Sequence, residues 1–352
     1  MSRTEHGAGV AHGLWFSAAR QAEMREEALR EPANSDVLVR AIVSLVSAGT
    51  ELRVYRGEVS GQDDLGLETA EGTFEFPVKY AYQVVGEVIQ AADGARFKPG
   101  DIVFARHPHQ DYFTIRSDNR LLSAVPAGLT PERAVFVNLL EVALNSQLDV
   151  PVRHGDCVVV YGQGIVGSLC AQLASRTAGT VIVVDPLAVR RQQALAGGAT
   201  AAFSPDEAAA GIEDLTNGRG ADISVEASGA PSALQAAITA TGQEGTIVAI
   251  SYFGMRAVTL TLAPEFHFRR QRIVSSQTSS LGSGLQPRWS LDRRIGVAFN
   301  LLQADWLRTP VSHRLPFANA AEAYRILDTT PELAAGILLA YSDGKDIDGV
   351  AK

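Results

Sequence analysis

The stretch that decides the fold is VVVYGQGIVGSLCAQLA, which runs from Val158 to Ala174. A run of β-branched residues ends in YGQGIVG, and an apolar, Ala-containing segment of helical character follows directly. The spacing G-x-G-x-x-G between a strand and a helix is typical of a loop whose bare backbone lets a pyrophosphate approach the positive end of the helix. The stretch therefore predicts a dinucleotide-binding loop, with contacts from Gly162, Gly164, Ile165, Val166 and Gly167.

A carboxylate follows where the ribose of such a nucleotide would lie. The next strand, TVIVVD, ends at Asp185, eighteen residues after Gly167. An acid here accepts hydrogen bonds from ribose hydroxyls and repels a 2′-phosphate, which favours NAD over NADP. Arg190 is expected to reach the ribose or the adenine. A solvated helix arginine is an equal alternative, and Arg191 beside it allows the reverse assignment.

Around this loop, short apolar runs alternate with Ala-rich helical runs from about residue 139 to 283. Such alternation predicts βαβ units around a parallel sheet, an α/β domain of the Rossmann type. Ligands bind such sheets at the carboxyl ends of the strands. Ser228 and Gly229 follow the third parallel strand and Ser251 follows the next, so we expect these three residues to line the nicotinamide side.

The two flanking segments have a different texture. Residues 1–138 contain short β-type runs bounded by Gly, Pro and Asp, which predict an antiparallel, barrel-like domain. Residues 284–352 return to mixed character, and we expect them to complete that first domain.

Composition excludes several classes of protein. The 352 residues are 46% hydrophobic, enough for two cores, and the net charge of −8 argues against nucleic acid as a partner. Cys157 and Cys170 lie in apolar runs, so no disulfide framework is expected. The N-terminal residues lack a signal-type apolar segment, and no apolar run reaches the roughly 20 residues of a membrane helix. The expectation is a soluble, cytoplasmic protein with a small-molecule substrate and no membrane partner.

The whole pattern resembles the medium-chain dehydrogenase/reductase superfamily. RFKPGDIVFA (Arg96 to Ala105) is similar to its Gly-Asp-x-Val step, and VPAGLTPERAVFVNLLEVALNSQLD (Val125 to Asp149) is similar to its linker into the cofactor domain. The resemblance implies a GroES-like β-barrel catalytic domain, a Rossmann domain and a homodimer.

Zinc members of that superfamily carry a Cys-Gly-Thr-Asp turn, a Gly-His-Glu step and a third ligand that is Cys or Glu. This sequence resembles them with Ala48-Gly49-Thr50-Glu51, with Ala81-Tyr82-Gln83, and with Asn138 or Val137 at the third place. The four-cysteine structural lobe is also missing. Because zinc needs three or four N, S or O donors, the resemblance implies a zinc-free member.

Two branches are similar in further detail. The SAGTE turn with Tyr82 looks like the bacteriochlorophyllide dehydrogenase branch. The segment EFHFRRQRIVSSQTSSLGSGLQPRWSLDRR (Glu265 to Arg294) resembles a bacterial group with sugar-oxidising members such as guloside 3-dehydrogenase.

Without a Lewis acid, proton transfer falls to side chains. Thr50 matches the hydroxyl residue that relays the proton in zinc members. Tyr82 could donate to a carbonyl or fill the emptied metal site. Glu51 and Glu141 are the nearest carboxylates in family register and are candidate bases, although Glu141 could equally be a helix-capping acid.

Substrate contacts are expected from two places. His107 and His109 lie in a loop that family geometry places over the site, or they are solvated. Donors and an aromatic plate in the distal segment suit a polyol, or they form a basic turn and a domain anchor; these residues are His267, Arg270, Gln277, Arg288 and Trp289.

The sequence thus favours a zinc-independent, NAD-dependent dehydrogenase of a secondary alcohol or ketone in a polyhydroxylated small molecule. One alternative is a zinc-free quinone or enoyl reductase that uses NADPH, against which Asp185 argues. An alternative of another class is a non-catalytic NAD-binding sensor or scaffold.

Overall fold

The computed structural model describes residues 9–62, 72–118, 120, 122–254 and 257–342. The chain forms two compact units. Unit 1 combines residues 1–136 with residues 311–352, and unit 2 is the intervening segment 137–310. None of the helices in the described ranges is long and apolar enough to cross a membrane.

Unit 2 contains a six-stranded parallel sheet in the order β10-β9-β8-β11-β12-β13. The strands are β8 (Cys157–Tyr161), β9 (Thr180–Val184), β10 (Ala201–Phe203), β11 (Ala221–Glu226), β12 (Thr241–Ala249) and β13 (Arg272–Ser275). All five residues of β8 are buried, because helices cover both faces of a parallel sheet. The strand order reverses beside β8, and such a switch point is where open α/β sheets bind ligands.

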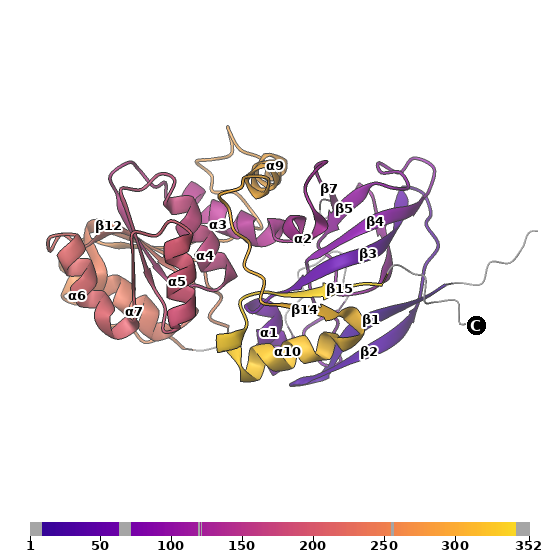
Figure 1. The fold of residues 1–352 in the computed structure, drawn as a ribbon, viewed down its shortest axis with the longest axis horizontal. Helices are drawn as coiled ribbons and strands as arrows, with labels where there is room; N and C mark the ends of the chain where they lie inside the picture. The colour runs from indigo at the N-terminus through magenta and orange to yellow at the C-terminus, as the bar shows by residue number, and fades with distance from the viewer. Residues whose placement is uncertain (1–8, 63–71, 119, 121, 255–256, 343–352) are drawn as a thin grey trace, which may run out of the picture. The chain divides into compact units, whose positions relative to one another are not determined.

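Helices connect these strands, and Figure 1 shows the longer of them packed along the sheet. They are α4 (Ile165–Ala174), α5 (Ala188–Ala196), α6 (Pro205–Leu215), α7 (Pro231–Ala240) and the short α8 (Glu265–Phe268). A buried cluster that includes Val159, Ile182 and Ile247 joins sheet and helices. The predicted Rossmann domain is confirmed.

The predicted boundary at 283/284 falls inside unit 2, because residues 284–310 group with that unit rather than with the returning segment. The cause is the packing of α9 (Leu291–Leu302) on α3 (Val137–Asp149). A buried arginine on α9, Arg294, bonds to side chains of α3. The chain enters unit 2 at 136/137, two residues before the predicted place.

Unit 1 is built on a seven-stranded sheet in the order β14-β15-β3-β4-β5-β7, with β6 also paired to β3. Its strands are β3 (Asp36–Val46), β4 (Val84–Ala91), β5 (Ile102–Ala105), β6 (Tyr112–Arg116), β7 (Leu122–Ala124), β14 (His313–Pro316) and β15 (Ile337–Ala340). All pairs are antiparallel except β14 with β15. A separate hairpin joins β1 (Val10–Ala18) to β2 (Gln21–Ala28).

The long strand β3 organises unit 1, since it pairs with β4, β6 and the returning strand β15. The helical elements are α1 (Thr50–Arg56), α2 (Pro131–Ala134), η1 (Phe317–Asn319), α10 (Ala320–Thr329) and η2 (Pro331–Leu333). One buried cluster joins Val46, Val54, Tyr324 and Leu339, so the returning segment shares a core with the first part of the chain. The predicted GroES-like barrel domain is confirmed.

Candidate active site

Three glycines shape the loop between β8 and α4, each in a different way. Gly162 has a φ of +87°, and a Cβ on it would lie 2.8 Å from Ser228 Cα. A Cβ on Gly167 would lie 1.9 Å from the carbonyl oxygen of Gly162. Gly164 has no atom within 4 Å of its Cβ position. Two glycines therefore allow the close turn, and the third leaves open space before α4.

This open space lies at the N-terminus of α4, where the first backbone N–H groups have no partner within the helix. Gly164 is the N-cap residue, and no side chain caps the helix. Ile165 is buried and Val166 half-buried. A bare helix start with free N–H groups favours a phosphate, so the loop fits the pyrophosphate of a dinucleotide.

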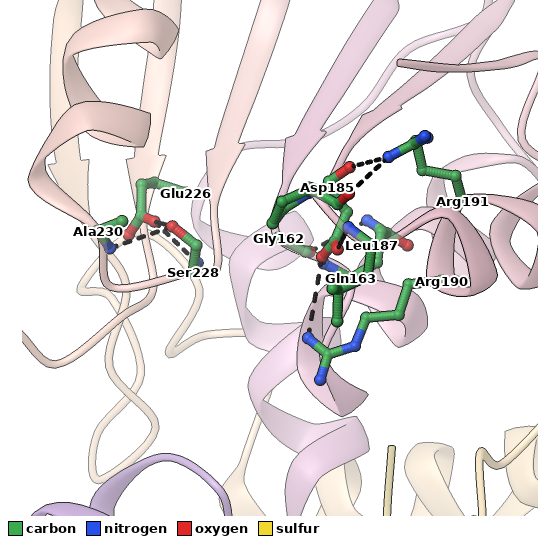
Figure 2. A network of polar contacts seen from close by, with 10 residues as sticks. Gly162, Gln163, Asp185, Leu187, Arg190, Arg191, Glu226, Ser228 and Ala230 are labelled. Atoms are coloured by element: carbon green, nitrogen blue, oxygen red, sulfur yellow. Dashed lines mark hydrogen bonds and ion pairs between the residues drawn. The ribbon is translucent and has the colours of Figure 1, made fainter. Parts of the chain in front are cut away.

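Asp185 directly follows strand β9 and lies beside this loop (Figure 2). Its buried carboxylate accepts the backbone N–H groups of Gln163 at 2.7 Å and Leu187 at 2.9 Å. The Arg190 guanidinium lies 3.9 Å from the same carboxylate, whereas Arg191 donates to the backbone carbonyl of Asp185 at 2.8 Å. The predicted neighbours of a ribose, Asp185 and Arg190, are thus together at the loop.

A second carboxylate, Glu226, ends strand β11 and was not predicted from the sequence (Figure 2). It is fully buried, and its Oε1 accepts both the backbone N–H and the hydroxyl of Ser228 and the N–H of Gly229. Ser251 donates to the Glu226 backbone carbonyl at 3.4 Å. The three residues expected on the nicotinamide side therefore share one anchor. The sequence does contain a signal for Glu226, which is an acid at the end of an apolar strand, in VEASG (Val225 to Gly229).

Glu141, a candidate base, is buried on α3 and ion-paired with Arg294, whose Nε lies 3.1 Å from Glu141 Oε1. Arg294 also donates to Asn145 Oδ1 at 2.7 Å and to the backbone carbonyl of Thr278 at 2.5 Å. Asn145 in turn donates to Ser276 Oγ at 3.1 Å. The network holds the segment that follows β13 in place. The sequence did not single out Arg294, because two adjacent arginines in an amphipathic helix are normally exposed to solvent.

The distal residues predicted to bind substrate do not form one cluster. Each has a separate setting: Arg270 ion-pairs with Glu244 at 2.9 Å, Gln277 accepts the N–H of Ser279, and Trp289 lies under the Arg293 guanidinium at 4.3 Å. His267 and Arg288 are exposed. Within the described residues, no side-chain hydrogen bond, ion pair or ring contact joins any two of the five.

In unit 1, the turn after β3 is held by a buried carboxylate. Glu51, in the first turn of α1, has no exposed surface, and its Oε2 accepts the backbone N–H of Ser47 at 2.9 Å. The same oxygen accepts the hydroxyl of Tyr324, on α10, at 3.0 Å. Ala48 and Thr50 remain at the outer side of the turn, exposed and half-exposed.

Tyr82 reaches this turn from the segment before β4. Its hydroxyl donates to Ser47 Oγ at 2.8 Å, and it also bonds to the Thr50 hydroxyl. Burial raises the pKa of the phenol well above its ordinary value, the charge of Glu51 raises the pKa further, and the two hydroxyl bonds oppose the shift. The structure thus brings together Thr50, Tyr82 and Glu51, and it adds Ser47, a residue that the sequence did not single out.

Both histidines of the HPHQ segment are buried, which rules out the alternative of a solvated loop. His107 stacks on Phe113 with ring centroids 3.9 Å apart, and burial lowers its pKa to about 3. His109 is 1% exposed, and its Nε2 lies 3.4 Å from Glu51 Oε2. His107 therefore belongs to the core, whereas His109 joins the Glu51 cluster.

A catalytic zinc does not fit the residues at the positions aligned with zinc ligands. Ala48 offers no donor, and the Tyr82 hydroxyl is engaged by Ser47 and Thr50. Gln83 is buried and donates to the Leu45 carbonyl at 3.3 Å. Across the described residues, no three His, Cys, Asp or Glu side chains are grouped as a metal ion requires.

Comparison with known proteins gives a consistent picture. A family model described as "Zinc-binding dehydrogenase" matches residues 166–290. The chain is 33% identical over 257 residues to D-guloside 3-dehydrogenase of Shigella flexneri, covering 71% of this chain and 73% of the relative. It is 25% identical over 339 residues to 2-desacetyl-2-hydroxyethyl bacteriochlorophyllide A dehydrogenase of Cereibacter sphaeroides, covering 92% and 96%.

Among solved structures, 2R,3R-butanediol dehydrogenase of Bacillus subtilis superposes with a TM-score of 0.77 at 17% identity. The match covers 94% of this chain and 99% of the other. At this level of identity the likeness shows the shared fold.

Proposed function

The chain belongs to the medium-chain dehydrogenase/reductase superfamily and is a nicotinamide-dependent oxidoreductase that acts on CH–OH groups; from this premise we propose a zinc-independent, NAD-dependent dehydrogenase. The proposed reaction interconverts a secondary alcohol and its ketone in a polyhydroxylated small molecule, such as a sugar, a cyclitol or a natural-product intermediate. The observation that carries the proposal is the Asp185 carboxylate beside the open glycine loop.

The preference for NAD rests on charge at the end of β9. The Asp185 carboxylate offers acceptors to ribose hydroxyls and repels a 2′-phosphate. The nearest guanidinium, Arg190, is directed at that carboxylate, and Arg191 is directed at a backbone carbonyl, so both arginines already have acceptors. To bind a 2′-phosphate, one arginine would have to leave its present acceptor, whereas ribose hydroxyls can donate to the Asp185 carboxylate without breaking either contact.

When bound, NAD supplies the acceptor for the hydride; the protein must position the alcohol and take its hydroxyl proton. We assign this task to Thr50 and Tyr82 in unit 1. The Tyr82 phenol is protonated near neutral pH, as an ordinary tyrosine is, and burial raises its pKa further, so it acts as a hydrogen-bond donor and not as a standing base. In the direction of oxidation, the substrate proton would pass along the Tyr82 and Thr50 hydroxyls and leave through Thr50, which is half-exposed; in reduction, the phenol would turn its proton from Ser47 to the carbonyl.

The proposed substrate class rests on the relatives. The 33% identical relative is named for a guloside, and the bacteriochlorophyllide relative is named for a hydroxyethyl group. In this chain, Gln277 and Arg288 offer exposed polar groups and Trp289 an aromatic face in the segment after β13. Amide and guanidinium donors with an aromatic plate suit a polyol.

Cofactor preference tests the proposal. With a panel of polyols, kcat/KM for NAD is expected to exceed that for NADP at least about tenfold, equivalent to about 1.4 kcal/mol. Asp185→Asn, which removes the charge and keeps the size, should narrow that ratio. Asp214→Asn, at an exposed acid near the end of α6, is the matched control and should leave it unchanged.

The outcomes separate the rivals. Clear selectivity for NADPH in the unaltered protein would replace the proposal with the quinone or enoyl reductase. Tight binding of NADH with no turnover on any alcohol would favour the sensor or scaffold.

Zinc independence has its own test. Dialysis against a strong chelator is expected to leave the NAD-linked rate unchanged, because Ala48 and Tyr82 leave no ligand set for the ion. Zinc measured by elemental analysis should be substoichiometric before and after dialysis. A rate lost on dialysis and restored by added zinc would refute this part of the proposal.

A further inference from the structure

A cluster of polar side chains lies behind the turn that carries Thr50 and next to the core of unit 1. Glu51 comes from α1, His109 from the segment between β5 and β6, and Tyr324 from α10. Glu51 and Tyr324 have no exposed surface, and His109 is 1% exposed. We call Glu51, His109 and Tyr324 the inner cluster.

The inner cluster is poorly satisfied as a structural element. Oε2 of Glu51 receives the Ser47 N–H and the Tyr324 hydroxyl and faces His109 Nε2 at 3.4 Å. Within the described residues, Glu51 Oε1 and both ring nitrogens of His109 have no hydrogen-bond partner. Burying such groups costs free energy, and well-packed apolar residues in place of buried ionic groups are often as stable or more so. Stability alone therefore does not account for the cluster.

What the cluster does hold is the turn. The Ser47 backbone N–H is bound by Glu51, and the Ser47 hydroxyl oxygen receives the Tyr82 hydroxyl. One residue, Ser47, thus links the buried carboxylate to the phenol through two short bonds. A shift of Glu51 would move Ser47 and release Tyr82 from its present orientation.

We propose that Glu51 and His109 are positioning residues: the buried pair fixes Ser47 and so holds the Tyr82 hydroxyl where a substrate oxygen can meet it. This inference rests on the proposed function, which assigns Tyr82 to the substrate. It reassigns Glu51, because a carboxylate without exposed surface, bound to a backbone N–H, is placed to orient and not to collect a substrate proton.

Glu51 also acts on its neighbours through charge. The titratable groups around Glu51 are Tyr82, Tyr324, Tyr341 and His109. The negative charge of Glu51 adds to burial in raising the pKa of all three phenols. Because a tyrosine is protonated near neutral pH in any case, this shift does not change the state of Tyr82, and Glu51 acts on it through the position of Ser47.

A double-mutant cycle tests the link. Glu51→Leu removes the acceptor at similar volume, Glu51→Gln keeps a carbonyl oxygen, and Tyr82→Phe removes the hydroxyl. We expect Glu51→Leu to lower kcat about ten- to hundredfold while the Kd for NADH stays the same, since misplacement of a reacting group costs this much. Glu51→Gln should recover most of the loss. Because Glu51 acts through Tyr82, the double variant Glu51→Leu/Tyr82→Phe should be no slower than Tyr82→Phe.

The opposite result is equally clear. If the two losses multiply, Glu51 acts independently of Tyr82 and the inference is wrong. A merely structural role would also change the Kd for NADH or the folded fraction, and it would not be rescued by glutamine.

His109→Phe tests the second of the two proposed positioning residues, since it keeps an aromatic ring and removes both ring nitrogens. Tyr341→Phe is the matched control, because it deletes a tyrosine hydroxyl bonded to Ser44 in the same unit at 2.9 Å. We expect kcat to fall several-fold in His109→Phe and to stay near that of the unaltered protein in Tyr341→Phe. Equal rates for both variants would remove His109 from the proposal.

Amide hydrogen exchange distinguishes failure of this inference from failure of the proposed function. If the unaltered protein turns over no alcohol, the proposed function fails, and the bond between Ser47 and Glu51 can still be read without turnover. Exchange in a peptide that contains Ser47 should rise about tenfold in Glu51→Leu and little in Glu51→Gln. If the exchange rate of this peptide were the same in the unaltered protein, Glu51→Leu and Glu51→Gln, Glu51 would not hold the Ser47 N–H and the inference would be wrong.

Discussion

Gly167→Ala is expected to abolish cofactor binding. The added Cβ would lie 1.9 Å from the carbonyl oxygen of Gly162 and 3.3 Å from Ala227 Cβ. The first of these obstacles is backbone, which cannot rotate away as a side chain can, so the start of α4 must move away from β8. The N–H groups of the helix start would then miss the pyrophosphate. Titration of NADH fluorescence, with circular dichroism on the same samples, measures both consequences.

Two other glycines provide the controls. Gly296, in the helix α9, has no atom within 4 Å of its Cβ position, so Gly296→Ala should be neutral or stabilise by about 0.5–1 kcal/mol. Gly164→Ala should fold like the unaltered protein and still bind NADH more weakly, because its methyl group enters the open space before α4. Unchanged NADH binding in Gly167→Ala would show that the loop is not the cofactor site.

Arg294→Met is expected to destabilise unit 2 by about 3–5 kcal/mol, because it leaves the buried Glu141 carboxylate without its counter-ion. The double change Arg294→Met/Glu141→Leu should recover part of that loss, since it removes the unpaired buried charge, while Asn145 Oδ1 and the Thr278 carbonyl still lose their donor. Denaturant unfolding, monitored by hydrogen exchange in peptides of α3 and α9, measures the free energy of unfolding of unit 2.

An exposed pair is the matched control for this prediction. Arg314 and Glu132 form an ion pair at 2.7 Å with both side chains about half exposed. Arg314→Met should therefore cost no more than about 1 kcal/mol. If Arg294→Met cost equally little, or if the double variant were no more stable than the single one, the buried pair would not carry the energy assigned to it.

The part of the fold that could be predicted is the part written in short-range patterns. Strand, glycine loop, helix and acid follow one another between Val158 and Asp185, and each step depends on residues close in sequence. The grouping of residues 284–310 with unit 2 depends instead on the packing of α9 on α3, a contact between segments some 150 residues apart. Amphipathic spacing identifies α9 as a helix and says nothing about its partner.

The same distinction between short-range patterns and long-range contacts applies to the candidate site. Asp185 and the glycines are recognised by their spacing, whereas Ser47, Tyr324 and Arg294 matter through partners far away in the chain. The opposite error occurred for the distal residues, where a sequence cluster rich in donors does not become a cluster of contacting side chains. For His109, the sequence identified a residue of interest and misjudged its surroundings, because burial is set by elements that the motif does not contain.

The return of the chain to unit 1 has a consequence for synthesis. Strand β15 pairs with β3 in the register Ile337 to Val46, and Tyr324 lies on α10, which precedes β15 in the returning segment. On a ribosome, β3 and the Glu51 turn emerge early, and the whole of unit 2 must be translated before their partners appear. Until then Glu51 has no phenol to bind and β3 has an open edge. The inner cluster is therefore assembled last, and a nascent chain can bear a finished nucleotide fold before it has a completed turn at Thr50.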